Sequence, residues 1–292
     1  MATLALPMIL AARAADAAGV LSPEGPIGAA NRQIMLNALG IMLVIVVPTI
    51  LAALVFAWWF RESNTKARYR PGFAYSGRIE LIVWSIPIMV ILFLGGVIWI
   101  GSHELDPATP IQSQNKPLNV QVVSLDWKWL FIYPDQGVAS VNDLVVPAGV
   151  PVRFMLTSDT VMNAFFIPQL GSMIYTMNGM VTQLHLQADR PGDYYGLSTM
   201  FSGDGFPDMH FIAHSVPADA FEKWVAGARG NGPALDQAGY ADLQRRKSRV
   251  QPFTYRSVDP HLFEMIATQK IPPGPGPDAG RGGPGVHPQP EG

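Results

Sequence analysis

The chemistry available to this 292-residue chain is limited first by the absence of cysteine. Disulfide scaffolds, thiolate sites for zinc or copper, and thiol catalysis are therefore excluded. Outside the apolar segments, the sequence contains no defensible Ser/His/Asp triad, phosphate-binding loop or pair of catalytic carboxylates. The remaining candidates are a histidine pair, a group of methionines and one glutamate.

His210 and His214 are four residues apart in an expected strand, so they share one face and a metal pair is conceivable. Because His185 belongs to a different strand and no third ligand is near, solvent-facing histidines are the favoured interpretation. Thioether sulfur is a soft ligand, so five methionines could form a copper-chaperone surface, although packing is favoured. These are Met173, Met177, Met180, Met200 and Met209.

Glu80 is the only charged residue in the apolar segment Ile79–Gly101. One interpretation is a carboxylate at a helix N-terminus, where it stabilises the helix by about 0.3–1 kcal/mol. The other is a place in a proton path, because ionisable residues in membrane helices often mark such paths. The sequence by itself leaves both open.

Two apolar segments, Ile34–Phe60 and Ile79–Gly101, predict a membrane anchor of two helices spanning residues 34–101. At about 1.5 Å per residue, the first reaches roughly 40 Å, more than the roughly 30 Å hydrocarbon core of a bilayer. Only 14% of the residues are charged, against roughly 25% in soluble domains. The formal net charge of −2 gives no basic field for nucleic acid.

The loop between these segments is basic, which predicts that it lies in the cytoplasm and that both termini lie in the periplasm of a bacterial inner membrane. Its basic residues are Arg61, Lys66, Arg68, Arg70 and Arg78, against Glu62. The far side offers only Arg32 and Lys116 next to the helices. Residues 1–33 form an N-terminal segment whose apolar stretch, Leu4–Ala12, is compatible with a signal peptide.

Residues 116–217 predict an all-β sandwich of short strands separated by turns. Apolar and polar side chains alternate along Val120–Tyr133, which is read as one long strand with one buried face. Residues 218–270 predict a helical arm, and the proline- and glycine-rich residues 271–292 predict a disordered tail. The helices expected in the arm are Ala218–Ala228, Ala234–Arg249 and Pro260–Gln269.

The sandwich opens on Asp126-Trp127-Lys128-Trp129-Leu130-Phe131-Ile132-Tyr133, and with the two helices before it the chain resembles subunit II of haem–copper oxidases. Val161-Met162-Asn163-Ala164-Phe165-Phe166-Ile167-Pro168, Gly171–Gly179 and the stretch from Pro191 to Met209 extend the resemblance over roughly residues 25–270. It implies a cupredoxin-like fold. Trp127 and Trp129 could relay electrons in copper-bearing members, but packing is favoured here.

In members that oxidise cytochrome c, this domain holds a two-copper centre with thiolate, imidazole, carboxylate and thioether ligands. The resemblance implies that the matching positions are a vestigial copper site, in which only the methionine survives. These positions are Asn163, Ser198, Met200, Ser202, Phe206 and Met209. Hydroxyl groups are poor ligands for a soft metal, so no metal is expected in this chain.

This pattern resembles the quinol branch, in particular the cytochrome bo-type ubiquinol oxidases. The resemblance implies a proton-pumping ubiquinol:oxygen oxidoreductase in which haems and one copper belong to subunit I and this chain binds no cofactor. Further small membrane subunits are expected as partners, and Glu80 is expected at the mouth of a proton channel. The nearest rival is a cytochrome c oxidase subunit II, and the alternative from another class is a membrane-tethered cupredoxin-like protein for copper delivery or partner binding.

Overall fold

The computed structural model describes residues 19–68, 70–245, 247 and 249–276, which divide into two compact units. The first unit holds the described residues up to Ala30 and from Asp106 onward, and the second is Asn31–Leu105. The predicted signal-peptide stretch, Leu4–Ala12, and most of the predicted tail, 277–292, lie outside the described residues.

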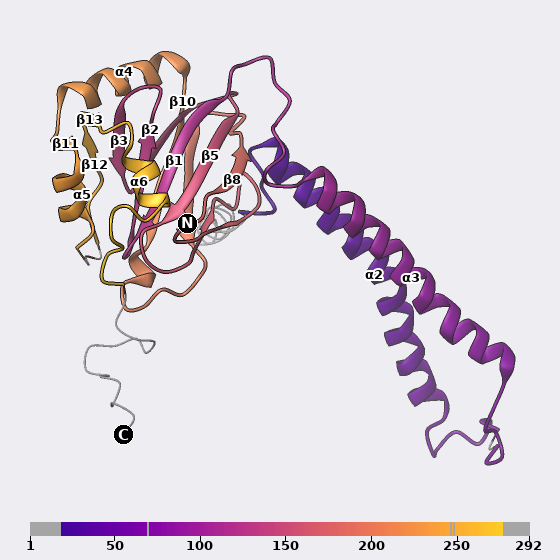
Figure 1. Cartoon of the computed structure of the whole chain (residues 1–292). Coiled ribbons are helices and arrows are strands. Elements are labelled where there is room, and N and C mark those ends of the chain that lie inside the picture. The colour runs from indigo at the N-terminus through magenta and orange to yellow at the C-terminus, as the bar shows by residue number, and fades with distance from the viewer. Residues whose placement is uncertain (1–18, 69, 246, 248, 277–292) are drawn as a thin grey trace, which may run out of the picture. The chain divides into compact units, whose positions relative to one another are not determined.

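The membrane unit consists mainly of two long helices, α2 (Pro26–Trp59) and α3 (Gly77–Glu104), which run side by side in Figure 1. α2 begins at Pro26, before the predicted segment, because proline is well tolerated in the first turn of a helix. α3 continues beyond the predicted segment through Ser102, His103 and Glu104. Both are long and apolar enough to cross a bilayer. The two helices pack closely near Gly101, since a Cβ at this position would lie 2.6 Å from the Ile34 side chain.

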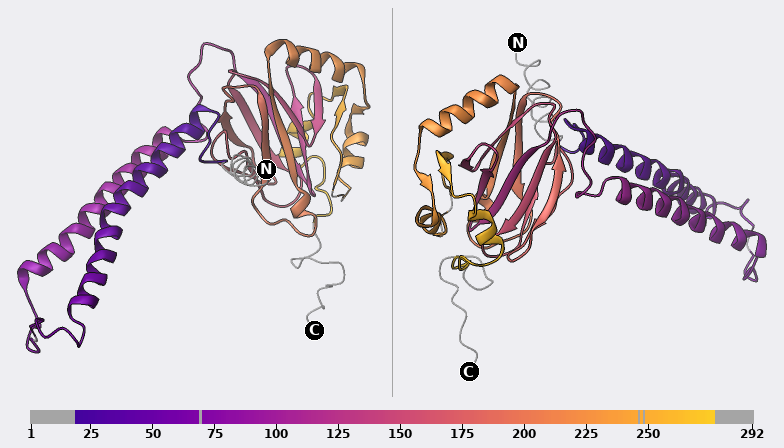
Figure 2. Two further views of the ribbon diagram at one scale, coloured as in Figure 1. Left: turned by 180° about the vertical axis from the view of Figure 1, so that it is seen from behind. Right: turned by 45° about the horizontal axis from the view of Figure 1, so that its top comes forward.

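The extramembrane unit is a sandwich of a six-stranded and a five-stranded sheet (Figures 1 and 2). The first has the order β12 (Phe253–Tyr255), β3 (Val138–Val141), β2 (Lys128–Tyr133), β1 (Leu118–Leu125), β5 (Val152–Ser158), β8 (Thr182–Leu186). The second has the order β4 (Asp143–Pro147), β10 (His210–Val216), β9 (Gly192–Ser198), β6 (Asn163–Phe166), β7 (Ile174–Thr176). The core between the sheets includes Trp129, Phe131, Phe165 and Phe211.

The prediction of one strand over Val120–Tyr133 is wrong, because the segment is a hairpin of β1 and β2. Leu125 pairs with Lys128 across a two-residue turn in which Trp127 has a φ of 66°. Paired residues share a face, so the turn exchanges odd and even positions between the two faces of the sheet. Leu125 therefore lies on the opposite face from Trp129. Both faces are apolar, and this hides the turn in the alternation.

The second face of the six-stranded sheet is covered by the C-terminal arm, which forms a third layer (Figure 2). Its side chains pack on β1, β2 and β3, and the buried ones include Leu235, Tyr240, Leu262, Phe263 and Ile266. The arm also contributes β12, which pairs antiparallel with β3 at the sheet edge.

The arm contains α4 (Ala218–Gly230) and α6 (Leu262–Ala267), which agree with two of the predicted helices. The helix predicted for Ala234–Arg249 is wrong, since this region contains β11 (Ala234–Leu235) and the short α5 (Gln237–Leu243). Asp236 explains the break, because its carboxylate accepts a hydrogen bond from the Gly239 amide and begins a new helix. β11 pairs with β13 (Ser257–Val258).

Candidate functional site

The six positions predicted to be a vestigial copper site come together at one end of the five-stranded sheet. Asn163 begins β6 and Ser198 ends the neighbouring β9, so these two residues are brought close by strand pairing. The remaining four follow in the connection from β9 to β10, which includes the short 3₁₀ helix η1 (Phe206–Asp208). These four are Met200, Ser202, Phe206 and Met209.

Asn163 and Ser198 form a buried hydrogen-bonded pair. The Ser198 hydroxyl donates to Asn163 Oδ1 at 3.2 Å and also lies 3.3 Å from the Met200 carbonyl oxygen. The Asn163 amide group donates to the Val161 carbonyl oxygen at 3.2 Å. Both side chains are almost fully buried. Their polar groups are therefore hydrogen-bonded to one another and to the neighbouring backbone, as burial of such groups requires.

Ser202 and Met209 form a second pair, in which the hydroxyl donates to the thioether sulfur at 3.9 Å. The Ser202 carbonyl oxygen accepts a hydrogen bond of 2.9 Å from the Trp127 indole. The two pairs are joined through the backbone, because the Ser198 amide donates to the Met209 carbonyl oxygen at 3.1 Å. Phe206 is half-buried, with its ring 5.6 Å from that of Phe201.

These residues do not fit a copper pair. Their side chains offer two hydroxyls, one amide, two thioethers and an aromatic ring, whereas soft copper sites use thiolate and imidazole. Over the described part of the chain, no group of three or more His, Asp or Glu side chains is arranged to hold a metal ion. The hydroxyls and the Asn163 amide are already engaged with each other or with the backbone. Chemically, the cluster can crosslink β6, β9 and the following loop.

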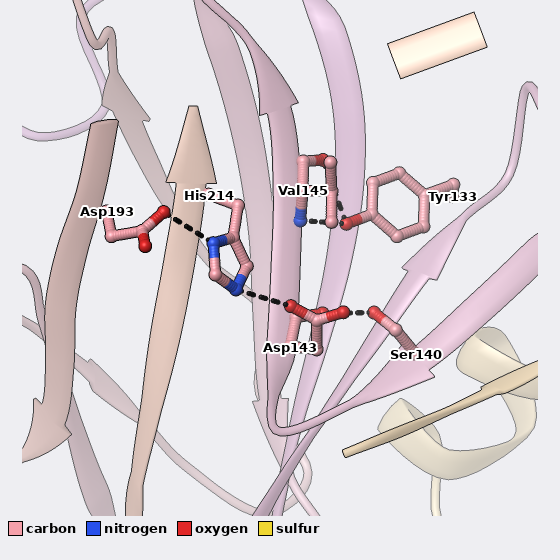
Figure 3. A network of polar contacts seen from close by, with 6 residues as sticks. All are labelled: Tyr133, Ser140, Asp143, Val145, Asp193 and His214. Atoms are coloured by element: carbon pink, nitrogen blue, oxygen red, sulfur yellow. Dashed lines mark hydrogen bonds and ion pairs between the residues drawn. The ribbon is translucent and has the colours of Figure 1, made fainter. Parts of the chain in front are cut away.

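His214 lies between two carboxylates, as Figure 3 shows. Its Nδ1 is 2.6 Å from Oδ1 of Asp193, its direct partner across β10 and β9, and its Nε2 is 3.3 Å from Oδ1 of Asp143. Burial raises the pKa of the Asp143 carboxyl, and the neighbouring His214 opposes this rise. His210 is exposed and its ring stacks on Tyr195 at 5.7 Å. Sequence spacing missed the carboxylates because three different strands supply the group.

The same close-up contains a buried tyrosine that ties the two sheets together. The Tyr133 hydroxyl donates to the Val145 carbonyl oxygen at 3.0 Å and accepts from the Val145 amide at 2.9 Å. The Ser140 hydroxyl donates to the backbone carbonyl of Asp143 at the start of β4. These bonds fix the strand that carries Asp143 and so hold it opposite His214.

A second polar cluster, which sequence reasoning missed, is buried under the arm. The Lys128 ammonium donates to the Arg245 carbonyl oxygen at 2.8 Å and lies 3.3 Å from the Asp126 carbonyl oxygen. Burial lowers the pKa of Lys128 to about 8, opposed by the charges of Asp126 and Asp159. The alternating pattern predicts that Lys128, as one of its polar residues, faces solvent. No local signal reveals that a distant segment covers it.

Asp159 is the acceptor that joins this cluster to the arm and to the start of the tail. Its Oδ1 accepts hydrogen bonds from the Tyr240 hydroxyl at 2.7 Å and from Gln244 Nε2 at 2.8 Å. Its Oδ2 accepts from the Gly274 amide at 3.1 Å. Burial raises the pKa of Asp159, and these hydrogen bonds oppose the rise. The beginning of the predicted tail is therefore held against the sandwich at Gly274.

The packing interpretation is confirmed for Trp129, whose buried ring meets Phe165 edge-on at a centroid distance of 5.3 Å. It is also confirmed for Met209, which is buried in the core between the sheets. Met173 and Met180 are instead 38% and 53% exposed, so they do not belong to the core.

Glu80 lies in the first turn of α3, and its amide donates to the Ser76 carbonyl oxygen at 3.0 Å. Its side chain is exposed on the surface of this single chain. The placement fits a carboxylate at a helix N-terminus and leaves it accessible to a partner.

The sandwich and its two preceding helices define a class of protein, the membrane-anchored subunit II of a respiratory oxidase. Residues 136–216 match the family described as cytochrome c oxidase subunit II, periplasmic domain. Two helices able to span a bilayer precede this match, which indicates an inner-membrane protein with a cupredoxin-like domain. This confirms the predicted fold class.

Full-length relatives specify the branch. The chain is 45% identical to the cytochrome bo(3) ubiquinol oxidase subunit 2 of Pseudomonas aeruginosa, over 86% of this chain and 76% of the relative. It is 46% identical to the ubiquinol oxidase subunit 2 of Acetobacter aceti, over 86% and 82%. It is 34% identical to the quinol oxidase subunit 2 of Bacillus cereus, over 84% and 86%. The chain belongs to the ubiquinol oxidase subunit 2 family and is a subunit of an oxidoreductase complex.

Proposed function

We propose that this chain is the copper-free subunit II of a proton-pumping respiratory ubiquinol:oxygen oxidoreductase. Electrons reach the complex from quinol in the membrane and enter subunit I, which holds the haems and one copper. This chain supports the assembly of subunit I and contributes the cytoplasmic mouth of a proton channel. Further small membrane subunits complete the complex.

The observation that carries this proposal is the side-chain bonding at the vestigial copper positions. Ser198 is hydrogen-bonded to Asn163, and Ser202 is hydrogen-bonded to Met209. The side-chain atoms of these four residues that could ligate a metal are therefore hydrogen-bonded to each other. A domain without a soft-metal ligand set has no means to take electrons from a soluble cytochrome. The names of the relatives, which are quinol oxidases, agree with a donor dissolved in the membrane.

The proposed topology has two membrane helices, a cytoplasmic loop and periplasmic termini. The loop has five basic residues between Arg61 and Arg78, which supports a cytoplasmic location by the positive-inside bias. The proposed division is an N-terminal segment 1–33, the anchor 34–101, the cupredoxin-like domain 116–217, the arm 218–270 and the tail 271–292. Glu80 then faces the cytoplasmic side, where protons are taken up.

Copper analysis of the purified oxidase tests the electron-transfer part of the proposal. We expect one copper per complex, which is the copper of subunit I, with the haem content as the internal standard. Three coppers per complex would mean that this chain holds a two-copper centre and would overturn the proposal. Stoichiometric copper on this chain separated from its partners would favour the alternative of a membrane-tethered copper-delivery protein.

Replacing the ionisable group at the proposed channel mouth tests the proton part. The variant Glu80→Gln keeps the size and polarity of the side chain but cannot carry a proton as a carboxyl group does. We expect quinol-driven oxygen consumption to fall several-fold. The matched control is Glu104→Gln, at the other end of α3, which should keep the wild-type rate. Equal rates for Glu80→Gln and wild type, at equal haem content, would refute the role.

A further inference from the structure

The loop between α2 and α3 contains an arginine-rich pocket to which the proposed function assigns no role. Its volume is about 570 Å³, and it is lined by residues of the segment from Phe60 to Phe73. Three of them are basic, one, Glu62, is acidic, and two are aromatic. The basic ones are Arg61, Arg68 and Arg70, and the aromatic ones are Phe60 and Phe73. We call this the loop pocket.

Hydrogen bonds within the loop hold the pocket in shape. The Asn64 side chain donates to the Trp59 carbonyl oxygen at 2.5 Å, which caps the last turn of α2, and accepts from the Lys66 amide at 3.2 Å. The Arg61 guanidinium lies 5.0 Å from the centroid of the Trp58 ring, and its Nε donates to the Ser63 hydroxyl at 3.0 Å. Arg61 is therefore oriented before any ligand arrives.

The positive charge of the loop is not neutralised within the chain. From Arg61 to Glu80 there are five basic and two acidic residues, which leaves a net charge of +3. Among the residues that the structure describes, no carboxylate lies within ion-pair distance of these basic side chains. Such a site is electrostatically incomplete, and an anion complements it.

The position of the loop pocket indicates which kind of anion it binds. α2 and α3 exceed the length needed to cross the roughly 30 Å hydrocarbon core, so their connection lies at the headgroup level. Phe60 and Phe73 are 60% and 59% exposed, which suits contact with an acyl chain better than contact with water. Basic clusters beside membrane helices attract anionic lipids, and arginine binds phosphate through two parallel hydrogen bonds.

We propose that the loop pocket binds an anionic phospholipid, with the arginines on its phosphate and the two phenylalanines against the start of its acyl chains. A free phosphate ion would use the arginines but not the phenylalanines. The inference goes beyond the oxidase function and does not depend on the role of Glu80.

Native mass spectrometry of the full-length chain, purified in neutral detergent with the subunits that accompany it, tests the proposal. Phosphatidylglycerol, phosphatidylcholine and inorganic phosphate are added in parallel. The test variant is Arg61→Gln/Arg68→Gln/Arg70→Gln. We expect wild type to bind phosphatidylglycerol in preference to phosphatidylcholine, and phosphate at a hundredfold excess not to displace it. At roughly fivefold per charge, the variant should bind phosphatidylglycerol up to about a hundredfold more weakly.

A control with the same loss of charge outside the membrane unit separates the pocket from general electrostatics. It is Lys116→Gln/Lys223→Gln/Arg256→Gln, three exposed positions of the extramembrane unit. This variant should bind phosphatidylglycerol as wild type does. Equal binding by the two triple variants, or full displacement of the lipid by phosphate, would overturn the proposal. So would loss of the partner subunits from the loop variant, because the loop would then be a protein interface.

Discussion

Lys128 tests whether burial under the arm has an energetic cost, because its ammonium group is enclosed between the sandwich and the arm. The side chain is 1% exposed, and its Nζ lies against two carbonyl oxygens. Desolvation disfavours a charged amine more than the nearby carboxylates of Asp126 and Asp159 favour it, so the pKa falls to about 8. We expect Lys128→Met to stabilise the fold at pH 7, since methionine keeps the apolar stem and removes the charge.

The size of the effect follows from the lowered pKa. The difference between 10.5 and about 8 corresponds to about 3 kcal/mol of unfavourable energy for the charged amine. Losing the hydrogen bond to Arg245 costs about 1 kcal/mol. The variant should therefore gain about 2 kcal/mol in free energy of unfolding at pH 7.

The sign of the pH dependence follows from proton linkage. Below pH 8 both the folded and the unfolded chain carry the Lys128 proton, so the penalty is fully present. Between pH 8 and 10.5 the unfolded chain binds more protons than the folded chain, so wild-type stability rises with pH through this group. The advantage of the variant must then shrink.

Urea unfolding of the full-length chain in neutral detergent, followed by tryptophan fluorescence, measures both effects. Wild type and Lys128→Met are compared at pH 7 and at pH 9.5, and other titrating groups cancel in the difference. A variant that is less stable than wild type at pH 7 would refute the reasoning. A stability gain that does not decline at pH 9.5 would also refute it.

Two further predictions concern the arm and the core between the sheets. Tyr240→Phe removes the hydroxyl that donates to the buried Asp159 carboxylate, and should lower the free energy of unfolding by about 1.5–3 kcal/mol in urea titrations. Gly196→Ala adds a Cβ that would lie 2.1 Å from the Phe211 ring, and should destabilise the protein by about 1–3 kcal/mol, measured as a lower melting temperature.

Each of these variants has a matched control elsewhere in the chain. Tyr255→Phe removes a hydroxyl from the same arm, and no hydrogen bond joins that hydroxyl to any described residue, so stability should change little. A Tyr240→Phe effect no larger than this control contradicts the first prediction. Gly227→Ala, in α4 with open space around it, should stabilise by about 0.5–1 kcal/mol. If Gly196→Ala stabilises the protein as Gly227→Ala does, the close approach of the Phe211 ring is not the reason for a glycine at position 196.

The membrane anchor and the absence of thiolate ligands could be predicted from sequence because each depends on local composition. A bilayer requires about 20 apolar residues in a row, and α2 and α3 contain such runs whatever the rest of the chain does. The absence of cysteine excludes thiolate chemistry in any fold. The role of Glu80 stays a prediction, because it concerns a partner chain.

The faces of the sandwich were decided only by the tertiary structure. Alternation reports that successive side chains point to opposite sides, but it does not say which sides a distant segment will cover. The arm covers the second face, and as a result Leu125 and Trp129 belong to different cores and Lys128 is buried. The sequence predicts a single strand with one buried face because both faces of the sheet carry apolar residues. The alternation therefore continues through the turn, although the two faces are exchanged there.

For the predicted vestigial copper site, the sequence and the fold again determined different things. The sequence by itself determined which residues stand at the six positions, and so that no thiolate or imidazole is among them. Only the fold placed Ser198 against Asn163 and Ser202 against Met209, because strand pairing and the connection from β9 to β10 bring together residues far apart in the chain. A hydrogen bond requires its partners within about 3.5 Å, and residue identity alone does not specify that distance.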